Sequence, residues 1–331
     1  MKSQRDLTFD IARALCALEI IAFWHLTNYL PEPYEYGPQL LHFGEKLTWG
    51  CLACFTFMSG YFLSKYSIST WKDVWFFYKK RLTRFYGMYF IAVLSLFLGG
   101  AILGTGFFKT TEQFVRTLLG VGCLSAPYPP TVWYFCMIMF FYLITPFVMC
   151  YKNEKKRIVV AVLLFAFLFV VKEMDFLDID ERLLVYYPFY VTGLLISKSF
   201  INKVKQSRSC LLLALPFLLF SYFIPKISIW EGIILDVMFI LTIIPLSNIL
   251  ASTKLAGLLK QISYASMVAY LFHRHFYLSA VFLYNYPDYR PLNEATMSPI
   301  VAIAIVIPLI FVSSFYFQKS YDLFINKYFK Q

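Results

Sequence analysis

Residues 9–25, FDIARALCALEIIAFWH, place four ionisable side chains in the first apolar segment of the chain, namely Asp10, Arg13, Glu19 and His25. The apolar run around them is long enough to predict a membrane-spanning helix. A charged residue at the centre of such a helix costs about 2.5–3.5 kcal/mol on insertion scales. We therefore expect this helix to face a protein interior or a central polar cavity rather than lipid.

The rest of the chain has the composition of an integral membrane protein. Of its 331 residues, 60% are hydrophobic and only 15% are charged, whereas soluble domains have about 45–50% and about 25%. This composition excludes an ordinary soluble globule and also a disordered chain, which needs high charge. The net charge is +11, but the basic residues lie between apolar runs, so no nucleic-acid partner is expected.

Apolar runs recur along the sequence and predict an all-α integral membrane fold of about ten transmembrane helices surrounded by membrane lipid. The runs are continuous, without the dyad alternation of a β-barrel. No internal repeat or linker divides them, so we expect a single transmembrane domain over residues 1–331. The expected spans are 7–30, 47–64, 85–104, 131–150, 157–172, 183–198, 210–225, 232–251, 262–282 and 298–318.

The basic residues predict the orientation of these helices. Of the 30 Lys and Arg residues, 21 fall in the connections on the side of the N-terminus and seven on the opposite side. Because cytoplasmic loops are enriched in Lys and Arg, both termini are predicted to be cytoplasmic, as in a multi-pass protein of a bacterial-type inner membrane. The charges in the first apolar segment argue against a cleavable signal peptide.

Neither redox nor metal chemistry is predicted. The seven cysteines lie in or beside apolar runs, which is not a disulfide framework. Cys51 and Cys54 form a CxxC pair without a βαβ context, so we interpret them as packing residues. His273 and His275 point about 200° apart on a helix and cannot share a metal ion without a break.

The ionisable residues within spans are candidates for catalysis. His25 has the side chain of a general base near neutral pH, and the alternative is a hydrogen-bonded core histidine. Asp10 and Arg13 are three residues apart and can pair on one helix face, either for function or as an internal salt bridge. The ninth span brings His273 and Arg274 to membrane depth.

A second candidate is the basic segment 79–84, which contains Lys80, Arg81 and Arg84. Arginine is suited to bidentate contacts with phosphate. The alternative interpretation is a topology signal or a contact with anionic lipid.

Several stretches form an ordered set along the chain. They are Phe9 to Leu15 with Trp24-His25, Cys54 to Leu63 with Ser59-Gly60, Phe77 to Phe85, Trp133-Tyr134-Phe135, and Ser263-Tyr264 to His273. In this order they resemble the motifs of the acyltransferase-3 family of integral-membrane acyltransferases, over essentially the whole chain. The resemblance implies transfer of an acyl group, usually acetyl, from acyl-CoA to a hydroxyl of a cell-surface polysaccharide or its lipid-linked precursor.

The resemblance also implies roles for residues. His25 would be the catalytic base, Arg13 would orient or stabilise negative charge, and Asp10 would complete the catalytic group. Arg81, Arg84 and Lys80 would bind the CoA phosphates. Acetyl-CoA would be a co-substrate, with no permanently bound cofactor. The expected substrate pocket contains Glu19, Trp133, Ser263, Tyr264 and His273.

The sequence departs from the family pattern at three places. Eleven residues separate Arg13 from His25, where the family usually has ten. Twelve helical steps turn about 1200°, which leaves the two side chains about 120° apart, so we predict a π-bulge that absorbs the extra residue. Arg274-His275 follows His273 where small or proline-containing sequence is usual, and Gly87 stands where the family often has proline.

Two other functions fit parts of this pattern. A transporter or flippase for a lipid-linked sugar or small anion would also use buried charges and histidines, but the sequence has no inverted repeat and no matched broken helices. A non-catalytic scaffold would leave the charges of the first span unexplained.

Overall fold

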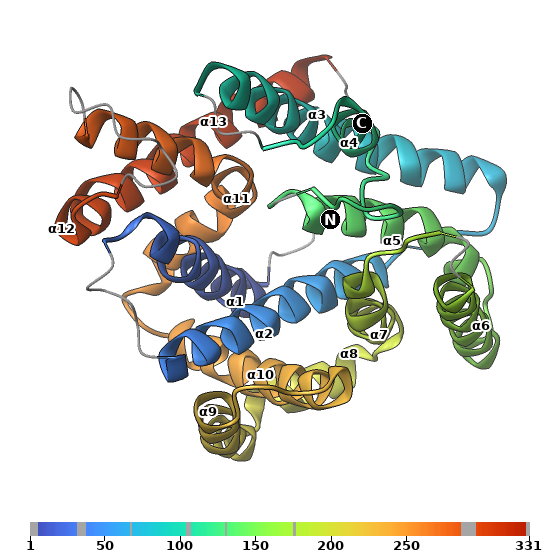
Figure 1. The fold of residues 1–331 in the computed structure, drawn as a ribbon. Coiled ribbons are helices and arrows are strands. Elements are labelled where there is room, and N and C mark those ends of the chain that lie inside the picture. The colour runs from blue at the N-terminus through green and yellow to red at the C-terminus, as the bar shows by residue number, and fades with distance from the viewer. Residues whose placement is uncertain are drawn as a thin grey trace. The chain divides into compact units, whose positions relative to one another are not determined.

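The computed structural model describes residues 6–31, 38–66, 68–103, 107–129, 131–174, 177–285 and 296–328. Within these ranges the chain forms helices and turns and no strand (Figure 1). The all-helical prediction is therefore confirmed. Four basic residues that entered the charge argument, Lys2, Arg5, Arg290 and Lys330, lie outside the described residues.

Each expected span falls on helical chain, although several helices extend beyond it. The helices on these spans are α1 (Leu7–Leu18) with η1 (Glu19–Trp24) and η2 (Leu26–Tyr29), α2 (Pro38–Leu63), α3 (Trp71–Leu103), α5 (Trp133–Met149), α6 (Glu154–Glu173), α7 (Glu181–Leu195), η4 (Arg208–Leu213) with α9 (Ala214–Phe223), α10 (Ile229–Leu250), α11 (Ala256–Tyr284), and α12 (Pro299–Val301) with η5 (Ala302–Val306) and α13 (Ile307–Tyr328). Two further helices, α4 (Thr111–Leu118) and α8 (Lys198–Gln206), lie in connections.

The early start of α3 has a local cause. The Asp73 carboxylate accepts from the backbone amide of Thr70 at 2.8 Å, and the Thr70 hydroxyl accepts from the amide of Asp73 at 3.2 Å. This reciprocal arrangement is a capping box, which satisfies amides that a helix N-terminus leaves free. The basic segment 79–84 is therefore part of one continuous helix with the apolar residues that follow it.

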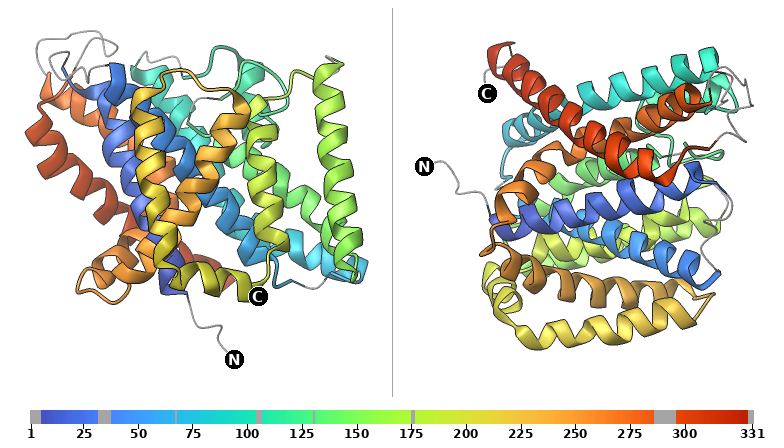
Figure 2. Two further views of the ribbon diagram at one scale, coloured as in Figure 1. Left: turned by 90° about the horizontal axis from the view of Figure 1, so that it is seen from below. Right: turned by 90° about the vertical axis from the view of Figure 1, so that its left-hand side faces the viewer.

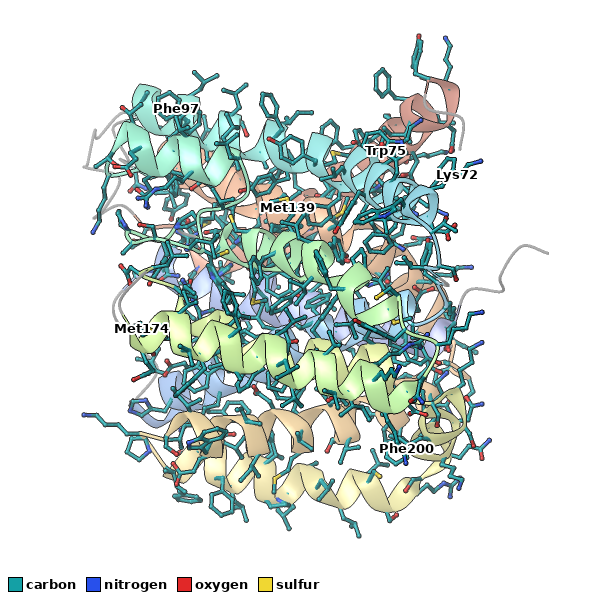
Figure 3. The ribbon with its side chains drawn as sticks, turned by 90° about the vertical axis from the view of Figure 1, so that its right-hand side faces the viewer. Lys72, Trp75, Phe97, Met139, Met174 and Phe200 are labelled. Atoms are coloured by element: carbon teal, nitrogen blue, oxygen red, sulfur yellow. The ribbon has the colours of Figure 1, made fainter. Side chains whose placement is uncertain are left out.

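The described residues have the surface of a membrane-embedded protein. Three helical segments within them, Trp71–Ala101, Ile229–Leu250 and Pro299–Tyr328, are long and apolar enough to cross a membrane. Large apolar side chains are exposed on many helices, and the exposed residues Trp75, Met174 and Phe200 are labelled in Figure 3. Water-soluble proteins rarely expose apolar surface on this scale. The total of ten spans and their orientation remain predictions.

The chain divides into two compact units. The first unit contains residues 1–55 and 197–320, and the second contains residues 56–196 and 321–331. In the first unit, α1 packs against both α10 and α11, while η4 and α9 pack against α10. Figure 2 shows α9 and α10 running side by side in yellow and gold.

A buried lysine joins two helices of the first unit. Lys46 of α2 is only 2% exposed, and its ammonium donates to the carbonyl of Ser221 at 3.3 Å and also to that of Ile224. These carbonyls lie at the C-terminal end of α9, where a cation interacts favourably with the helix dipole. The lysine thus provides donors for carbonyl groups that the end of α9 leaves without helical partners.

In the second unit, α5 packs against α3, α6 and α7. The end of α2 crosses α7 at two glycines. A Cβ atom on Gly60 would lie 2.0 Å from the carbonyl oxygen of Tyr190, and one on Gly193 would lie 2.1 Å from that of Phe57. Small residues of this kind let membrane helices approach to backbone contact, which gives the Ser59-Gly60 motif a structural role.

Candidate active site

The first helix changes its winding just before the catalytic candidate. α1 ends at Leu18, and a π-helix covers Glu19–Trp24. The amide of His25 donates to the carbonyl of Ile20, five residues back, at 3.0 Å. A π-turn adds a residue without adding rotation, so Arg13 and His25 leave the helix within about 20° of one face rather than about 120° apart. The predicted π-bulge is present.

A tyrosine of α11 supports this wide turn. The hydroxyl of Tyr277 donates to the carbonyl of Ile21 at 2.7 Å, within the π-helix. A wide turn disturbs the regular i to i−4 ladder, and a buried carbonyl without a donor is costly. Tyr277 is 0% exposed, so its hydroxyl supplies that donor from the neighbouring helix.

His25 and His273 form a stacked pair between η1 and α11. Their ring centroids are 4.6 Å apart and their planes differ by 7°. Nδ1 of His25 lies 2.6 Å from Nε2 of His273, and Nδ1 of His273 lies 2.7 Å from the carbonyl oxygen of Tyr270. His273 is fully buried, whereas His25 is half-buried. Of the two rings, His25 is the one open to a substrate.

These contacts define the proton positions on the neutral rings. A carbonyl oxygen only accepts, so Nδ1 of His273 carries the hydrogen and Nε2 of His273 is the acceptor. His25 then donates from Nδ1, which leaves the lone pair of its Nε2 free. An imidazole held in one tautomer by its other nitrogen is suited to take a proton at a fixed position.

Asp10, Arg13 and Ser263 meet at the other end of the α1–α11 contact. The hydroxyl of Ser263 donates to Oδ1 of Asp10 at 3.4 Å, and the Arg13 guanidinium lies 3.7 Å from the same oxygen. Asp10 is 3% exposed. The first-helix and late-helix motifs are therefore in direct contact, and the predicted pairing of Asp10 with Arg13 is confirmed.

Arg13 and His25 share a face of the helix but lie far apart along it. Eleven helical rises of 1.5 Å separate their backbones by about 16 Å. Side chains of a helix tilt toward its N-terminus, and the Arg13 guanidinium lies beside Asp10, one turn before it. The charge of Arg13 is thus directed away from the imidazole pair.

Glu19 lies between these two groups on the first helix. Its Oε1 accepts from the hydroxyl of Thr48 on α2 at 2.9 Å, and its Oε2 is buried without a hydrogen-bond partner among the described residues. The thiol of Cys51 also bonds to Glu19, and Cys16 contacts both Cys51 and Cys54. The CxxC pair therefore packs against α1, as expected of packing residues.

Arg274 follows His273 on α11. The positive charge of its guanidinium acts on the side chains of His25, His273 and Tyr29. Among the described residues its buried Nε has no hydrogen-bond partner, and no carboxylate lies within ion-pair distance of its guanidinium. His275, by contrast, packs against Phe272 with ring centroids 5.4 Å apart. Within the described part of the chain, Arg274 therefore brings a positive charge without an acidic partner to the imidazole pair.

The predicted phosphate-binding residues belong to the second unit. Arg81 is held among three aromatic rings, with its Cζ 5.0 Å from the centroid of Tyr66 and 5.9 Å from those of Phe77 and Tyr142. Its Nε is buried without a hydrogen-bond partner in the described chain. Lys80 lies over the Tyr66 ring, and Arg84 is exposed. Cation–π contacts orient a guanidinium without using its hydrogen-bond donors.

Two predicted pocket residues have aromatic or cationic neighbours of their own. The Arg182 guanidinium lies 3.9 Å from the centroid of Trp133, and Arg182 also pairs with Asp180. In the first unit, the ring of Tyr264 meets that of Phe315 edge-on, with centroids 5.3 Å apart.

Sequence reasoning missed Tyr270 and Tyr277 and gave Arg274 no role. A signal for the tyrosines was available, because positions 263, 266, 270, 273 and 277 follow a 3-4 spacing that puts them on one helix face. The structure turns this face of α11 toward α1. Arg274 lies outside this spacing, and the absence of an acidic partner is visible only in three dimensions.

Comparison with known proteins identifies the family of this chain. A family model described as an acyltransferase domain, that of the acyltransferase-3 family, matches residues 6–319. Because this match covers nearly the whole chain, the protein belongs to the acyltransferase-3 family. No curated protein and no solved structure matches the chain.

Proposed function

We propose that this protein is a membrane-bound O-acyltransferase. It moves an acyl group, in the first instance acetyl, from acyl-CoA to a hydroxyl of a cell-surface polysaccharide or its lipid-linked precursor. The observation that carries the proposal is the His25–His273 pair, which offers one half-buried and oriented imidazole in a chain of an acyltransferase family.

In the proposed reaction, Nε2 of His25 takes the proton of the acceptor hydroxyl as its oxygen attacks the thioester carbonyl. The carbonyl electron pair moves to oxygen and forms a tetrahedral intermediate. Collapse of this intermediate expels the CoA thiolate, which receives the proton from His25. An ester and free CoA result. His273 accepts the Nδ1 hydrogen of His25 throughout, so it holds the ring and stabilises the imidazolium.

Acyl-CoA is a co-substrate in this scheme and no resident cofactor is needed. Arg81, Arg84 and Lys80 are proposed to bind the phosphates of CoA. The aromatic rings around Arg81 leave its planar fork of donors available for a bidentate phosphate contact. Asp10 and Arg13 are proposed to belong to the catalytic group of His25 on the first helix. Glu19, Trp133, Ser263, Tyr264 and His273 are proposed to contact the substrate.

The proposed setting is a bacterial-type inner membrane. Ten spans with both termini in the cytoplasm would place the basic segment 79–84 on the side where acyl-CoA is made. The distribution of Lys and Arg in the sequence supports this orientation. The polar groups of the first helix would then line a cavity within the membrane domain.

The test is transfer of radiolabelled acetyl from acetyl-CoA in membranes that contain either the wild-type protein or His25→Ala at equal levels. The host's lipid-linked glycans serve as acceptors. We expect label in the glycan with the wild type and none with the variant. Equal label with both would remove His25 from the mechanism. Glycan transport that survives His25→Ala without any acylation would favour the transporter alternative.

A further inference from the structure

We propose that Arg274 is a catalytic residue whose guanidinium binds the oxyanion formed at the thioester carbonyl. This inference rests on the proposed acyltransferase function. It assigns to Arg274 the stabilisation of negative charge that the family resemblance implies for Arg13.

The position of Arg274 favours this assignment over Arg13. Arg13 lies about 16 Å from His25 along the helix and is paired with Asp10. Arg274 directly follows His273, whose ring is stacked on His25 at 4.6 Å. The charge of Arg274 acts on both His25 and His273, so Arg274 is the arginine whose charge acts where a hydroxyl on Nε2 of His25 would attack a carbonyl.

The ion pairs and hydrogen bonds of Arg274 also favour a role in binding the oxyanion. Structural arginines at membrane depth are normally paired, yet no carboxylate in the described parts of the chain pairs with Arg274. Its buried Nε also lacks an acceptor among the described residues. Within that part of the chain Arg274 is thus a donor group without an acceptor, as required of a group that binds charge appearing only in the transition state.

The net charge of the site is the same before and after the attack on the thioester. Before attack, the neutral His25 and the Arg274 cation carry one positive charge together. After attack, the imidazolium, the guanidinium and the oxyanion again sum to one. The proton moves from the acceptor oxygen to Nε2 of His25 while the carbonyl electron pair moves to the oxygen beside Arg274, so the net charge of the site is unchanged.

The experiment compares wild type with Arg274→Gln, Arg274→Lys and the control Arg208→Gln. Arg208 is exposed on η4 in the same unit. With acetyl-CoA and a neutral glycan acceptor, we expect Arg274→Gln to lower kcat by about 10²–10³-fold with little change in KM for either substrate. Arg274→Lys should restore part of kcat, and Arg208→Gln should match the wild type.

Folding is checked by the elution profile of each purified protein in detergent, and Arg274→Lys covers the case in which Arg274→Gln does not fold. An unchanged kcat in the folded variants would overturn the inference. So would a rise in KM alone, seen only with a carboxylate-bearing acceptor or with succinyl-CoA, because Arg274 would then be a ground-state anion site. A wild type that acylates no acceptor would instead overturn the proposed function, and this inference with it.

Discussion

The hydroxyl of Tyr277 on α11 bonds to the carbonyl of Ile21 inside the π-helix of the first span, at 2.7 Å. This single contact links the supporting helix to the irregular turn that positions His25. The ring of Tyr277 also meets His273 edge-on, with centroids 6.0 Å apart. One residue therefore contacts both the wide turn and the buried member of the imidazole pair.

We expect Tyr277→Phe to destabilise the protein by about 1–3 kcal/mol, because the Ile21 carbonyl loses its donor in a buried position. The measurement is thermal unfolding in detergent together with acyl transfer. The control is Tyr316→Phe, since Tyr316 is 62% exposed in the same unit. Equal unfolding temperatures for Tyr277→Phe and the control would show that the contact contributes nothing.

The π-helix predicts opposite effects of shortening and lengthening the turn. Deletion of Ala22 should convert the wide turn to regular α-helix and keep His25 in register, with kcat within about tenfold of wild type, or about 1.4 kcal/mol. Insertion of one alanine after Ala22 should turn His25 by about 100° away from His273 and abolish acyl transfer. Equal losses in both variants, at equal membrane levels, would argue against this register.

The role of His273 predicts that an acceptor atom matters more than ring size. His273→Phe keeps a ring but removes the acceptor for Nδ1 of His25, and we expect kcat to fall by about 10²–10⁴-fold. His273→Gln retains an oxygen acceptor and should recover part of this loss, with KM unchanged in both. If the two variants are equally impaired, His273 acts by packing alone.

The aromatic surroundings of Arg81 predict an effect on CoA affinity. Loss of a charged hydrogen bond of about 1.5–3 kcal/mol should raise KM for acyl-CoA about ten- to a hundredfold in Arg81→Gln, with little change in kcat. Arg116→Gln is the control, because Arg116 belongs to the same unit and is paired with Glu112. An unchanged KM would favour the topology or anionic-lipid interpretation of the basic segment.

The crossing of α2 and α7 predicts a strong effect of one methyl group. Gly60→Ala places a Cβ against the carbonyl of Tyr190, and overpacking of this kind costs about 1–3 kcal/mol. Gly99→Ala is the control, since a Cβ there meets nothing within 4 Å and alanine gains about 0.8–1 kcal/mol in helix propensity. Unfolding temperatures that move in the same direction would contradict the close crossing.

Much of the fold was predictable because apolar runs and helical periodicity are local properties of the sequence. The π-bulge was predictable for a stronger reason, since the interval from Arg13 to His25 fits no regular helix that aligns them. The helices α2 and α3 begin many residues before the expected spans, because charged and polar residues interrupt the apolar ones in their first turns. Capping by Thr70 and Asp73 explains the true start of α3.

The site was less predictable than the fold. His25 and His273 were identified individually, but the 2.6 Å contact between them depends on how α1 packs on α11. The stabilising role of Arg13 came from the family resemblance, whereas the geometry separates Arg13 from His25 along the helix axis and brings the charge of Arg274 to the imidazole pair. Gly87 likewise has a neighbour that only the structure reveals, since Tyr321 packs on it and bonds to the carbonyl of Thr83.

The wide turn also changes how sequences of this kind should be compared. An interval counted in residues measures distance only while the winding is uniform, and between Glu19 and Trp24 it is not. A search pattern with a fixed gap between arginine and histidine would discard this chain, although its histidine occupies the angular position that a regular helix would give it with one residue fewer in the gap. A pattern that lets the gap vary by one residue would retain both, with the longer gap marking a π-turn.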